Sequence, residues 1–396
     1  MDEQKKTDAP VYKKALGVET FVFPVIFLGI FAGFAIKMGL GNALNTMMNT
    51  AYRLLIDTVL YLTAICVLMG AISALLSEFG FVSLANRVLR PLMRPVYGLP
   101  GAAALGVVTT FLSDNPAILA LADDHEFRRC FKAYQFPALT NLGTAFGMGL
   151  IVCSFMYGLA IRMPDEKIGL AVILGLVGAI VGSIVSTRLM LIFTKKRFGT
   201  EAPMEHDAGA EAQIPAGMRQ IRSGRIGSRV MAAILEGGHS GVKMGVSIVP
   251  GVLVICTLVM MLTNGPSASG EYTGAAYEGV RLLPWLASKI DFILGPMFGF
   301  TTPDAIGVPV TALGAAGAAL GVTSTLVDEA LIHANDIAVF TAMCMCWSGY
   351  LSTHTSMMDS LDCQELIGKA ILCHTIGGLC AGVAAHWLFV LLSMVV

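Results

Sequence analysis

Seven apolar segments, each about long enough to cross a bilayer as a helix, dominate the 396-residue sequence. A hydrocarbon core about 30 Å thick requires roughly 20 apolar residues in a helix. Charged residues make up only 13% of the chain and fall mainly between these segments. The sequence therefore predicts an all-α, multi-pass membrane protein with spans near 19–38, 51–78, 133–161, 168–194, 242–263, 334–358 and 368–395.

Two further apolar stretches, 96–122 and 296–326, are interrupted by proline and glycine. Proline removes a backbone donor and breaks a helix. Irregular backbone at membrane depth is tolerated only where it is buried in protein or lines a cavity. Both stretches are predicted to be re-entrant hairpins that return to the side from which they entered. One kinked span each is the alternative.

Lys and Arg residues are concentrated at the N-terminus and in segments 87–94, 128–132 and 195–229, and the other loops are poor in them. Short basic loops lie in the cytoplasm. Seven spans and two re-entrant hairpins place every basic loop in the cytoplasm when the N-terminus is cytoplasmic and the C-terminus lies outside. A hairpin that crossed fully would move the later basic loops to the wrong side. We therefore expect this orientation in a plasma (inner) membrane.

The two halves of the chain share one order of features, a span, a broken hairpin and a second span. Short segments correspond between the halves: 64–68 with 254–258, 94–99 with 295–300, and 121–124 with 326–329. The spans between the copies make the second copy enter the membrane in the opposite direction. Inverted repeats with discontinuous helices are typical of secondary transporters. Chance similarity between apolar segments is the alternative.

This repeat predicts a division of the chain into five parts. They are a cytoplasmic N-terminus (1–18), a first span and loop (19–50), repeat 1 with the fourth span (51–196), a cytoplasmic linker (197–228) and repeat 2 with the last span (229–396). Within repeat 2, residues 229–241 are predicted to form an interfacial helix that leads into the fifth span.

The first candidate site lies in the first hairpin, where Thr110, Ser113, Asp114 and Asn115 precede Pro116. An ionisable group within the bilayer costs at least about 2.5–3.5 kcal/mol, so it is rarely there without a role. A proline break exposes helix termini, beside which a carboxylate and an amide could bind an ion or a polar solute. The alternative is that Ser113 or Asp114 only caps the helix that follows.

The second hairpin offers a related set, in which Thr302 and Asp304 flank Pro303. A hydroxyl, a proline and a carboxylate again fall close together. These residues come early in their hairpin, so an external cap is an equal interpretation.

Two spans carry too many polar groups for lipid-facing helices, and we expect these groups to face the protein interior. The candidates are Asn141 and Thr144 in one span and Ser348, Ser352 and His354 in the other. An imidazole can take up a proton near neutral pH, which would suit a coupling proton. A hydrogen-bonded interior histidine is the alternative for His354.

The sequence has no nucleotide-binding P-loop, no HExxH and no Ser-His-Asp order, so it predicts neither a cofactor nor an enzyme. Its basic residues are scattered between apolar segments, which argues against nucleic-acid binding.

With its paired hairpins and the segment Thr-Phe-Leu-Ser-Asp-Asn-Pro at 110–116, the chain resembles the Gate, or nucleoside-recognition, group of membrane proteins. That group includes concentrative nucleoside transporters, the gate region of ferrous-iron transporters and spore-maturation membrane proteins. The segment is also similar to an Asn-Pro segment of ethanolamine-utilisation permeases. The resemblance covers about 50–160 and 240–360. Concentrative nucleoside transporters carry Gln-Thr-Glu in the first hairpin, where this chain has Ser113-Asp114-Asn115.

The resemblance implies an ion-coupled carrier with its substrate between hairpin tips and broken helices. The leading hypothesis is therefore a proton- or sodium-coupled secondary transporter of a small polar solute, nucleoside-like by the resemblance, that works by alternating access in the lipid bilayer. The resemblance also allows a homo-oligomer. One alternative is a non-transporting membrane partner or scaffold of the Gate group. Another is a membrane-embedded enzyme that uses His354 and Asp359.

Overall fold

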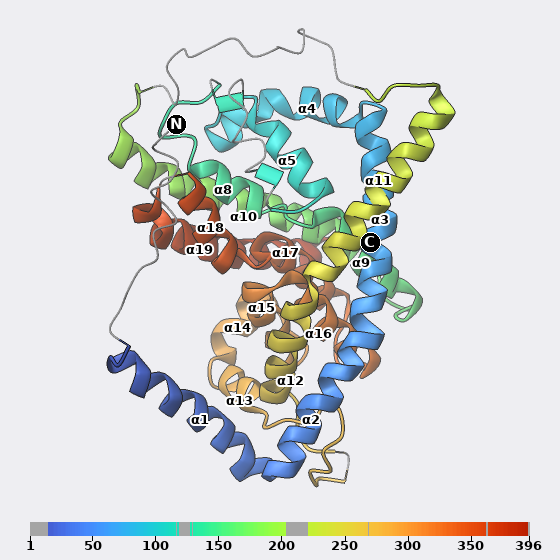
Figure 1. Ribbon diagram of the computed structural model, residues 1–396, viewed down its shortest axis with the longest axis vertical. Coiled ribbons are helices and arrows are strands. Elements are labelled where there is room, and N and C mark those ends of the chain that lie inside the picture. Colours follow the sequence, from blue (N-terminus) through green and yellow to red (C-terminus); the bar gives the residue numbers. More distant parts are fainter. Residues whose placement is uncertain are drawn as a thin grey trace.

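The computed structural model describes residues 15–115, 117–118, 127–128, 130–202, 221–267, 269–361 and 363–394, without the side chains of Ser352 and Ser360. These residues form a bundle of α-helices (Figure 1), which confirms the predicted fold class. Within the described ranges, six helical segments are long and apolar enough to cross a bilayer: Val18–Met38, Leu40–Glu78, Ala138–Ile161, Ile168–Phe198, Ile226–Thr263 and Gln364–Ser393. They contain six of the seven predicted spans.

Some of these segments are single helices, and others join consecutive helices. The elements are α1 (Val18–Met38), α2 (Leu40–Arg53), η1 (Leu54–Val59), α3 (Leu60–Glu78), α10 (Ile168–Phe198), α11 (Ile226–Ser247), η4 (Gly251–Cys256), α12 (Thr257–Thr263), η6 (Gln364–Leu366) and α19 (Ile367–Ser393). The π-helical segments η1 and η4 contact each other. Two long segments, one from each half of the chain, therefore meet where their helical pitch changes.

The remaining predicted span, 334–358, is present as two shorter helices. These are α17 (Ala334–Trp347) and α18 (Tyr350–Ser360). The predicted span 133–161 is also interrupted, by a turn at 145–148, and contains α8 (Ala138–Thr144), α9 (Gly149–Gly158) and η3 (Leu159–Ile161). One span in each half of the chain is thus broken near its middle.

Each half also contains the broken stretch that the sequence predicts as a hairpin. In the first, α4 (Phe81–Leu92) and η2 (Met93–Tyr97) lead to α5 (Ala103–Leu112), and part of the return arm lies outside the described residues. In the second, the elements are α13 (Leu282–Lys289), α14 (Asp291–Phe298), η5 (Pro303–Ile306), α15 (Gly307–Gly314) and α16 (Ala316–Asp328). The arms α15 and α16 contact each other and are shorter than the roughly 20 residues that a span needs. The lengths favour a re-entrant second hairpin.

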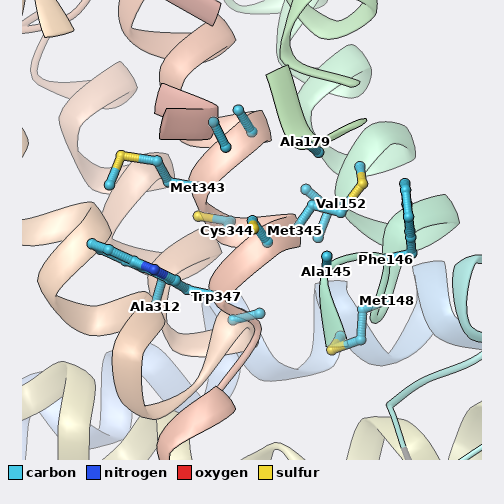
Figure 2. Close-up of a cluster of buried hydrophobic side chains, with 14 of the residues drawn as sticks. Ala145, Phe146, Met148, Val152, Ala179, Ala312, Met343, Cys344, Met345 and Trp347 are labelled. Atoms are coloured by element: carbon cyan, nitrogen blue, oxygen red, sulfur yellow. The ribbon is translucent and has the colours of Figure 1, made fainter. Parts of the chain in front are cut away.

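The centre of the bundle is formed by α10, α17 and α19, which contact one another. Small residues let their backbones approach closely, as is common between membrane helices. A Cβ atom added to Gly182 of α10 would lie 2.5 Å from the carbonyl oxygen of Gly377 in α19. The apolar core continues into the broken span, where Ala145, Phe146 and Met148 gather with Met345 of α17 (Figure 2).

A second close crossing joins α3 to α11, at one side of the bundle in Figure 1. A Cβ atom on Gly241 would lie 2.3 Å from the carbonyl oxygen of Cys66, and one on Gly237 would lie 2.3 Å from that of Gly70. No side chain fits between the two backbones at these points. The contact links the third helix of the first half with the first helix of the second half.

Residues 229–241, expected as an interfacial helix, belong to the continuous helix α11, which leads into the rest of the long segment Ile226–Thr263. The glycine-rich face of α11 packs on α3. Helix α4 is strongly amphipathic and has no fully buried residue. It exposes Phe81, Leu84, Val88 and Leu92.

Candidate functional site

The two broken helices meet at their interruptions. In the first, Met148 adopts a left-handed φ of 56° between α8 and α9. In the second, Ser348 and Gly349 have φ values of 26° and 69° between α17 and α18. A positive φ is unfavourable for a residue with a side chain and is often found at functional sites. The breaks leave carbonyl groups at the ends of α8 and α17 without the continuous helix that would bond them.

The tip of the first hairpin inserts between these two breaks through Asn115, which is 2% exposed. Its Nδ2 donates a hydrogen bond to the carbonyl oxygen of Ser348 at 2.9 Å. A Cβ atom on Gly147 would lie 1.6 Å from Asn115 Oδ1 and 3.0 Å from Ser348 Oγ. The hairpin tip and both breaks are therefore in direct contact, and we call this place the junction.

Three buried oxygen atoms at and next to the junction lack a hydrogen-bond partner among the described residues. They are Asn115 Oδ1, Ser348 Oγ and, at the end of α8, Thr144 Oγ1. An unsatisfied buried polar group costs about 1–3 kcal/mol, so such groups mark a strained or ligand-binding place. Amide, hydroxyl and carbonyl oxygens are the ligands that hard cations prefer.

The neighbouring residues of the hairpin are satisfied locally. Thr110 Oγ1 donates to the carbonyl of Gly106 at 2.8 Å, and Ser113 Oγ donates to that of Thr109 at 2.7 Å. The half-buried Asp114 accepts a hydrogen bond from the backbone N–H of Asn115 at 2.7 Å through Oδ1. Ser113 thus bonds to the preceding helix, whereas Asp114 bonds within the turn itself.

Ser113 also lines a cavity of about 200 Å³ between the hairpin tip, α9, α3 and α11. The polar side chains of this cavity are Cys66, Ser73, Ser113, Arg222, Glu236 and Ser240. Its volume is below the roughly 300–1,000 Å³ of sites for drug-sized ligands, which indicates a small solute.

Thr302 and Asp304 lie at the entrance of the second hairpin and not at its tip. Thr302 Oγ1 caps η5 and donates to Asp304 Oδ2 at 3.0 Å, and Arg281 Nη2 lies 3.1 Å from the same carboxylate. Burial, with the carboxylates of Asp304 and Asp328 nearby, raises the pKa of Glu329 at the far end of the hairpin. Asp304 therefore belongs to the base of the hairpin.

The second hairpin turns at Ala315, whose backbone is extended. It reaches the second break through a backbone hydrogen bond, in which the N–H of Gly349 donates to the carbonyl of Ala312 at 2.9 Å. The junction is thus polar toward the first hairpin and built of small residues toward the second.

Asn141 belongs to a hydrogen-bond chain beside the junction. Its Nδ2 donates to Ser186 Oγ at 3.0 Å, and Ser186 Oγ lies 2.9 Å from His374 Nδ1. His374 Nε2 lies 2.5 Å from the carbonyl oxygen of Cys346. Because a carbonyl only accepts, Nε2 carries the proton and Nδ1 accepts from Ser186. Ser186 and His374 were not among the predicted site residues.

His354 is fully buried and stacks at a tilt on His374, with ring centroids 4.5 Å apart. Its Nδ1 donates to the carbonyl of Tyr350 at 3.1 Å, and its Nε2 has no partner in the described part of the chain. The side chain of Ser352 lies outside that part. Asp359 is exposed and accepts a hydrogen bond from Gln364 at 2.7 Å. His354 is thus buried, whereas Asp359 is exposed.

Comparison with known families gives a match to Gate, described as nucleoside recognition, at residues 59–196. This range includes α3, the first hairpin, both halves of the first broken helix and α10. We refer to residues 59–196, which match this family model, as the Gate region. The Gate region therefore contains Asn115 and Thr144, two of the three residues with unpartnered oxygens, whereas Ser348 lies in the second half of the chain. No curated protein matches the chain.

Solved structures of CNTnw share the fold across most of both chains. An outward-facing state of a doubly substituted variant has a TM-score of 0.51 at 13% identity, and covers 94% of this chain and 84% of that one. An inward-facing, substrate-bound state gives 0.50 at 14% identity, with coverage of 93% and 82%. The intermediate 1 state of a singly substituted variant gives 0.51 at 14%, with coverage of 93% and 85%. The likeness extends beyond the Gate region to the second half of the chain.

Proposed function

We propose that the protein is an integral membrane transporter of a small, polar, nucleoside-like solute, driven by a cation gradient and working by alternating access. One observation carries this proposal. The polar tip of a membrane hairpin lies between two broken helices and next to buried, unpartnered oxygens. The fold shared with CNTnw, whose structures are described as outward-facing, intermediate and inward-facing, supports the same function.

The coupling ion in this proposal is sodium, held at the junction. Asn115 Oδ1, Ser348 Oγ and Thr144 Oγ1 supply neutral oxygens, and the ends of α8 and α17 add carbonyls and the negative end of the helix dipole. Amides and hydroxyls do not titrate near neutral pH, so these groups suit a metal cation better than a proton. Proton coupling through His354 is the competing outcome of the test.

The solute enters the cavity beside Ser113, where serine hydroxyls can bond its polar groups. The moving part consists of the hairpins and the helices α8, α10, α17 and α19, which pack on one another. The frame is the crossed pair α3 and α11, whose main contacts are with each other. Movement of one body along the other would expose the cavity to either side in turn.

The test is thermal unfolding of the purified protein against nucleosides, nucleobases, amines and amino acids, with and without sodium and across pH. A ligand at 100 times its dissociation constant adds about 2.7 kcal/mol of stability. We expect stabilisation by nucleosides that sodium enhances. Enhancement by low pH alone would replace sodium with a proton. A flat panel from folded protein would favour the non-transporting membrane partner.

A further inference from the structure

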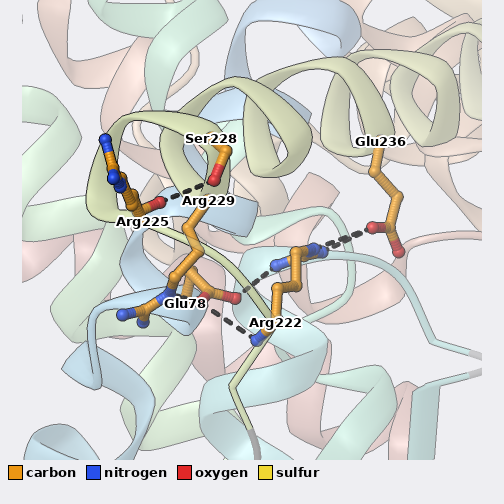
Figure 3. Close-up of polar contacts among 6 residues, drawn as sticks. All are labelled: Glu78, Arg222, Arg225, Ser228, Arg229 and Glu236. Atoms are coloured by element: carbon orange, nitrogen blue, oxygen red, sulfur yellow. Dashed lines mark hydrogen bonds and ion pairs between the residues drawn. The ribbon is translucent and has the colours of Figure 1, made fainter.

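Four charged side chains form one network at the end of α3, where the chain enters α11 (Figure 3). Glu78, the last residue of α3, is only 3% exposed at its side chain. Its carboxylate accepts from Arg229 Nε at 2.7 Å and from Arg222 Nη1 at 2.5 Å. The backbone N–H of Arg222 also donates to it, at 3.3 Å. Glu78 therefore fixes both the side chain and the backbone of Arg222.

The same guanidinium reaches a second carboxylate. Arg222 Nη2 and Nε lie 2.6 Å and 3.0 Å from Glu236 Oε2, and the Glu236 side chain is 70% exposed. Removing a partner from a buried carboxylate leaves a buried charge uncompensated, whereas an exposed ion pair contributes little. Of the two contacts of Arg222, the one to Glu236 is the one that opens readily.

This exposed contact lies on the cavity that the first hairpin enters. Arg222 and Glu236 line it together with Leu112 and Ser113 of the hairpin tip. Another lining residue, Cys66, is 1% exposed, so the ion pair forms the rim and Cys66 the interior. The rim lies near the basic segments 87–94 and 195–229, which predict the cytoplasmic side.

We propose that the Arg222–Glu236 ion pair is a latch across the cytoplasmic mouth of this cavity. Glu78 and Arg229 hold Arg222 in place, and Glu236 leaves when the mouth opens. The inference rests on the proposed function, in which the cavity is the path of the solute. It assigns a gating role to one residue just before α11 and one within α11, both outside the hairpins and the broken helices.

Two native cysteines allow a direct test of access. Cys66 lies inside the cavity, and Cys130 is exposed in a basic loop that is predicted to be cytoplasmic. A small, membrane-impermeant thiol reagent is applied to the cytoplasmic face of oriented vesicles, and labelling of both peptides is followed by mass spectrometry. The ratio of the Cys66 rate to the Cys130 rate reports opening of the mouth. Cys130 corrects for reagent and orientation.

We expect Glu236→Gln to raise this ratio by up to about fivefold, which is the largest shift that an exposed ion pair is expected to give an opening equilibrium. Glu365→Gln is the matched control, because it breaks the exposed Arg197–Glu365 pair, which lines no part of the cavity. It should leave the ratio unchanged. An unchanged ratio in Glu236→Gln, or an equal rise in both variants, would overturn the latch.

The dependence of this ratio on salt concentration is a second measurement, and it requires no further variant. Screening weakens exposed ion pairs, so high salt should raise the ratio in the parent protein and much less in Glu236→Gln. The same salt response in both proteins would also overturn the latch. Neither readout uses a solute, so failure of the latch is separate from failure of the transport function. If the latch behaves as expected but the protein binds none of the solutes, only the proposed transport function is contradicted.

Discussion

Asn115 combines two roles in one amide. Its Nδ2 holds the second break at 2.9 Å, and its Oδ1 is a buried acceptor without a partner in the described ranges. Replacement by alanine removes a proposed cation ligand and the tie to Ser348 together. We expect Asn115→Ala to raise the sodium concentration for half-maximal stabilisation or uptake at least about tenfold, which corresponds to about 1.4 kcal/mol. Sodium titration of the melting temperature measures this.

The matched control for that change is Asn45→Ala on α2, which removes an amide packed beside Gly274 in the loop before α13. Its sodium dependence should equal that of the parent. If Asn115→Ala kept the sodium dependence of the parent while remaining folded, the junction would not be the cation site.

A substitution at Gly147 tests the junction by adding a Cβ atom there. A Cβ atom there would lie 1.6 Å from Asn115 Oδ1, a distance that the hairpin tip can only avoid by moving. We expect Gly147→Ala to abolish sodium-dependent binding and to lower stability by about 1–3 kcal/mol, as overpacking does. Gly29→Ala on α1 meets nothing within 4 Å and should be neutral. Calorimetry and sodium binding on both variants decide the matter, and a neutral Gly147→Ala would contradict the close contact.

The sequence could point to Asn115, Thr144 and Ser348 because polar groups within apolar runs need a reason. It left Thr302 and Asp304 open between a binding site and an external cap, because a hydroxyl, a proline and an acid suit both, and the structure shows Thr302 as the cap of η5. His374 and Ser186 were missed as site neighbours for a different reason. They lie on different helices that are far apart in the sequence, and only the packing of α10 on α19 brings them together.

At the scale of elements, the crossing of α3 and α11 depends on glycine. A Cβ atom on Gly241 would lie 2.3 Å from the Cys66 carbonyl, a backbone atom that cannot rotate away. We expect Gly241→Ala to separate the helices and lower the melting temperature clearly. Gly227→Ala is the control in the same helix, because a Cβ atom there meets nothing within 4 Å. Equal melting temperatures for the two variants would show that the crossing is not close.

Polar contacts stabilise the loop between α12 and α13 and join it to α2. Glu278, 3% exposed, accepts from the side chain of Thr273 at 2.7 Å and from the backbone N–H of Gly274 at 3.0 Å. Thr46 of α2 lies 3.4 Å away. Burial alone would raise the pKa of Glu278, but the hydrogen bonds from Thr273 and the backbone outweigh it, and the net pKa is lowered.

A lowered folded-state pKa means that the carboxylate stabilises the loop above its unfolded pKa, about 4.3. This stabilisation is lost as the pH falls below that value and through the folded pKa. We expect Glu278→Gln to speed hydrogen exchange of residues 271–281 at neutral pH, and this difference from the parent to shrink in acid. Glu271→Gln, at an exposed position of the same loop, is the control. A difference that persists unchanged in acid would contradict this role.

The broken second span shows what the sequence conveys about an element. A stretch with Ser348 and Gly349 at its middle was recognisable as polar and prone to unwinding, and the structure places left-handed residues there. The amphipathic helix α4 was missed because its arginines belong to a segment that was read as a basic cytoplasmic loop before the predicted hairpin 96–122. Helix ends inside a membrane depend on packing partners as well as on propensity.

At the scale of the whole molecule, the all-helical class and the order of spans and hairpins follow from hydropathy and proline positions. The meeting of the first hairpin with the second broken helix does not. Asn115 and Ser348 are 233 residues apart, and nothing local specifies that contact. The opposite orientation of the two halves and the placement of the termini stay predictions, which rest on the distribution of Lys and Arg.

The number of crossings decides the placement of the C-terminus. The six long segments of the described ranges and one predicted crossing by α17 and α18 together give seven, so the predicted cytoplasmic N-terminus puts the C-terminus outside. We expect alkaline phosphatase fused after α19 to be active and a green fluorescent protein at the same place to stay dark. Both reporters fused before α1 should give the reverse. A fluorescent C-terminal fusion would mean an even number of crossings, and the α17–α18 pair would then have to return to the side from which it entered.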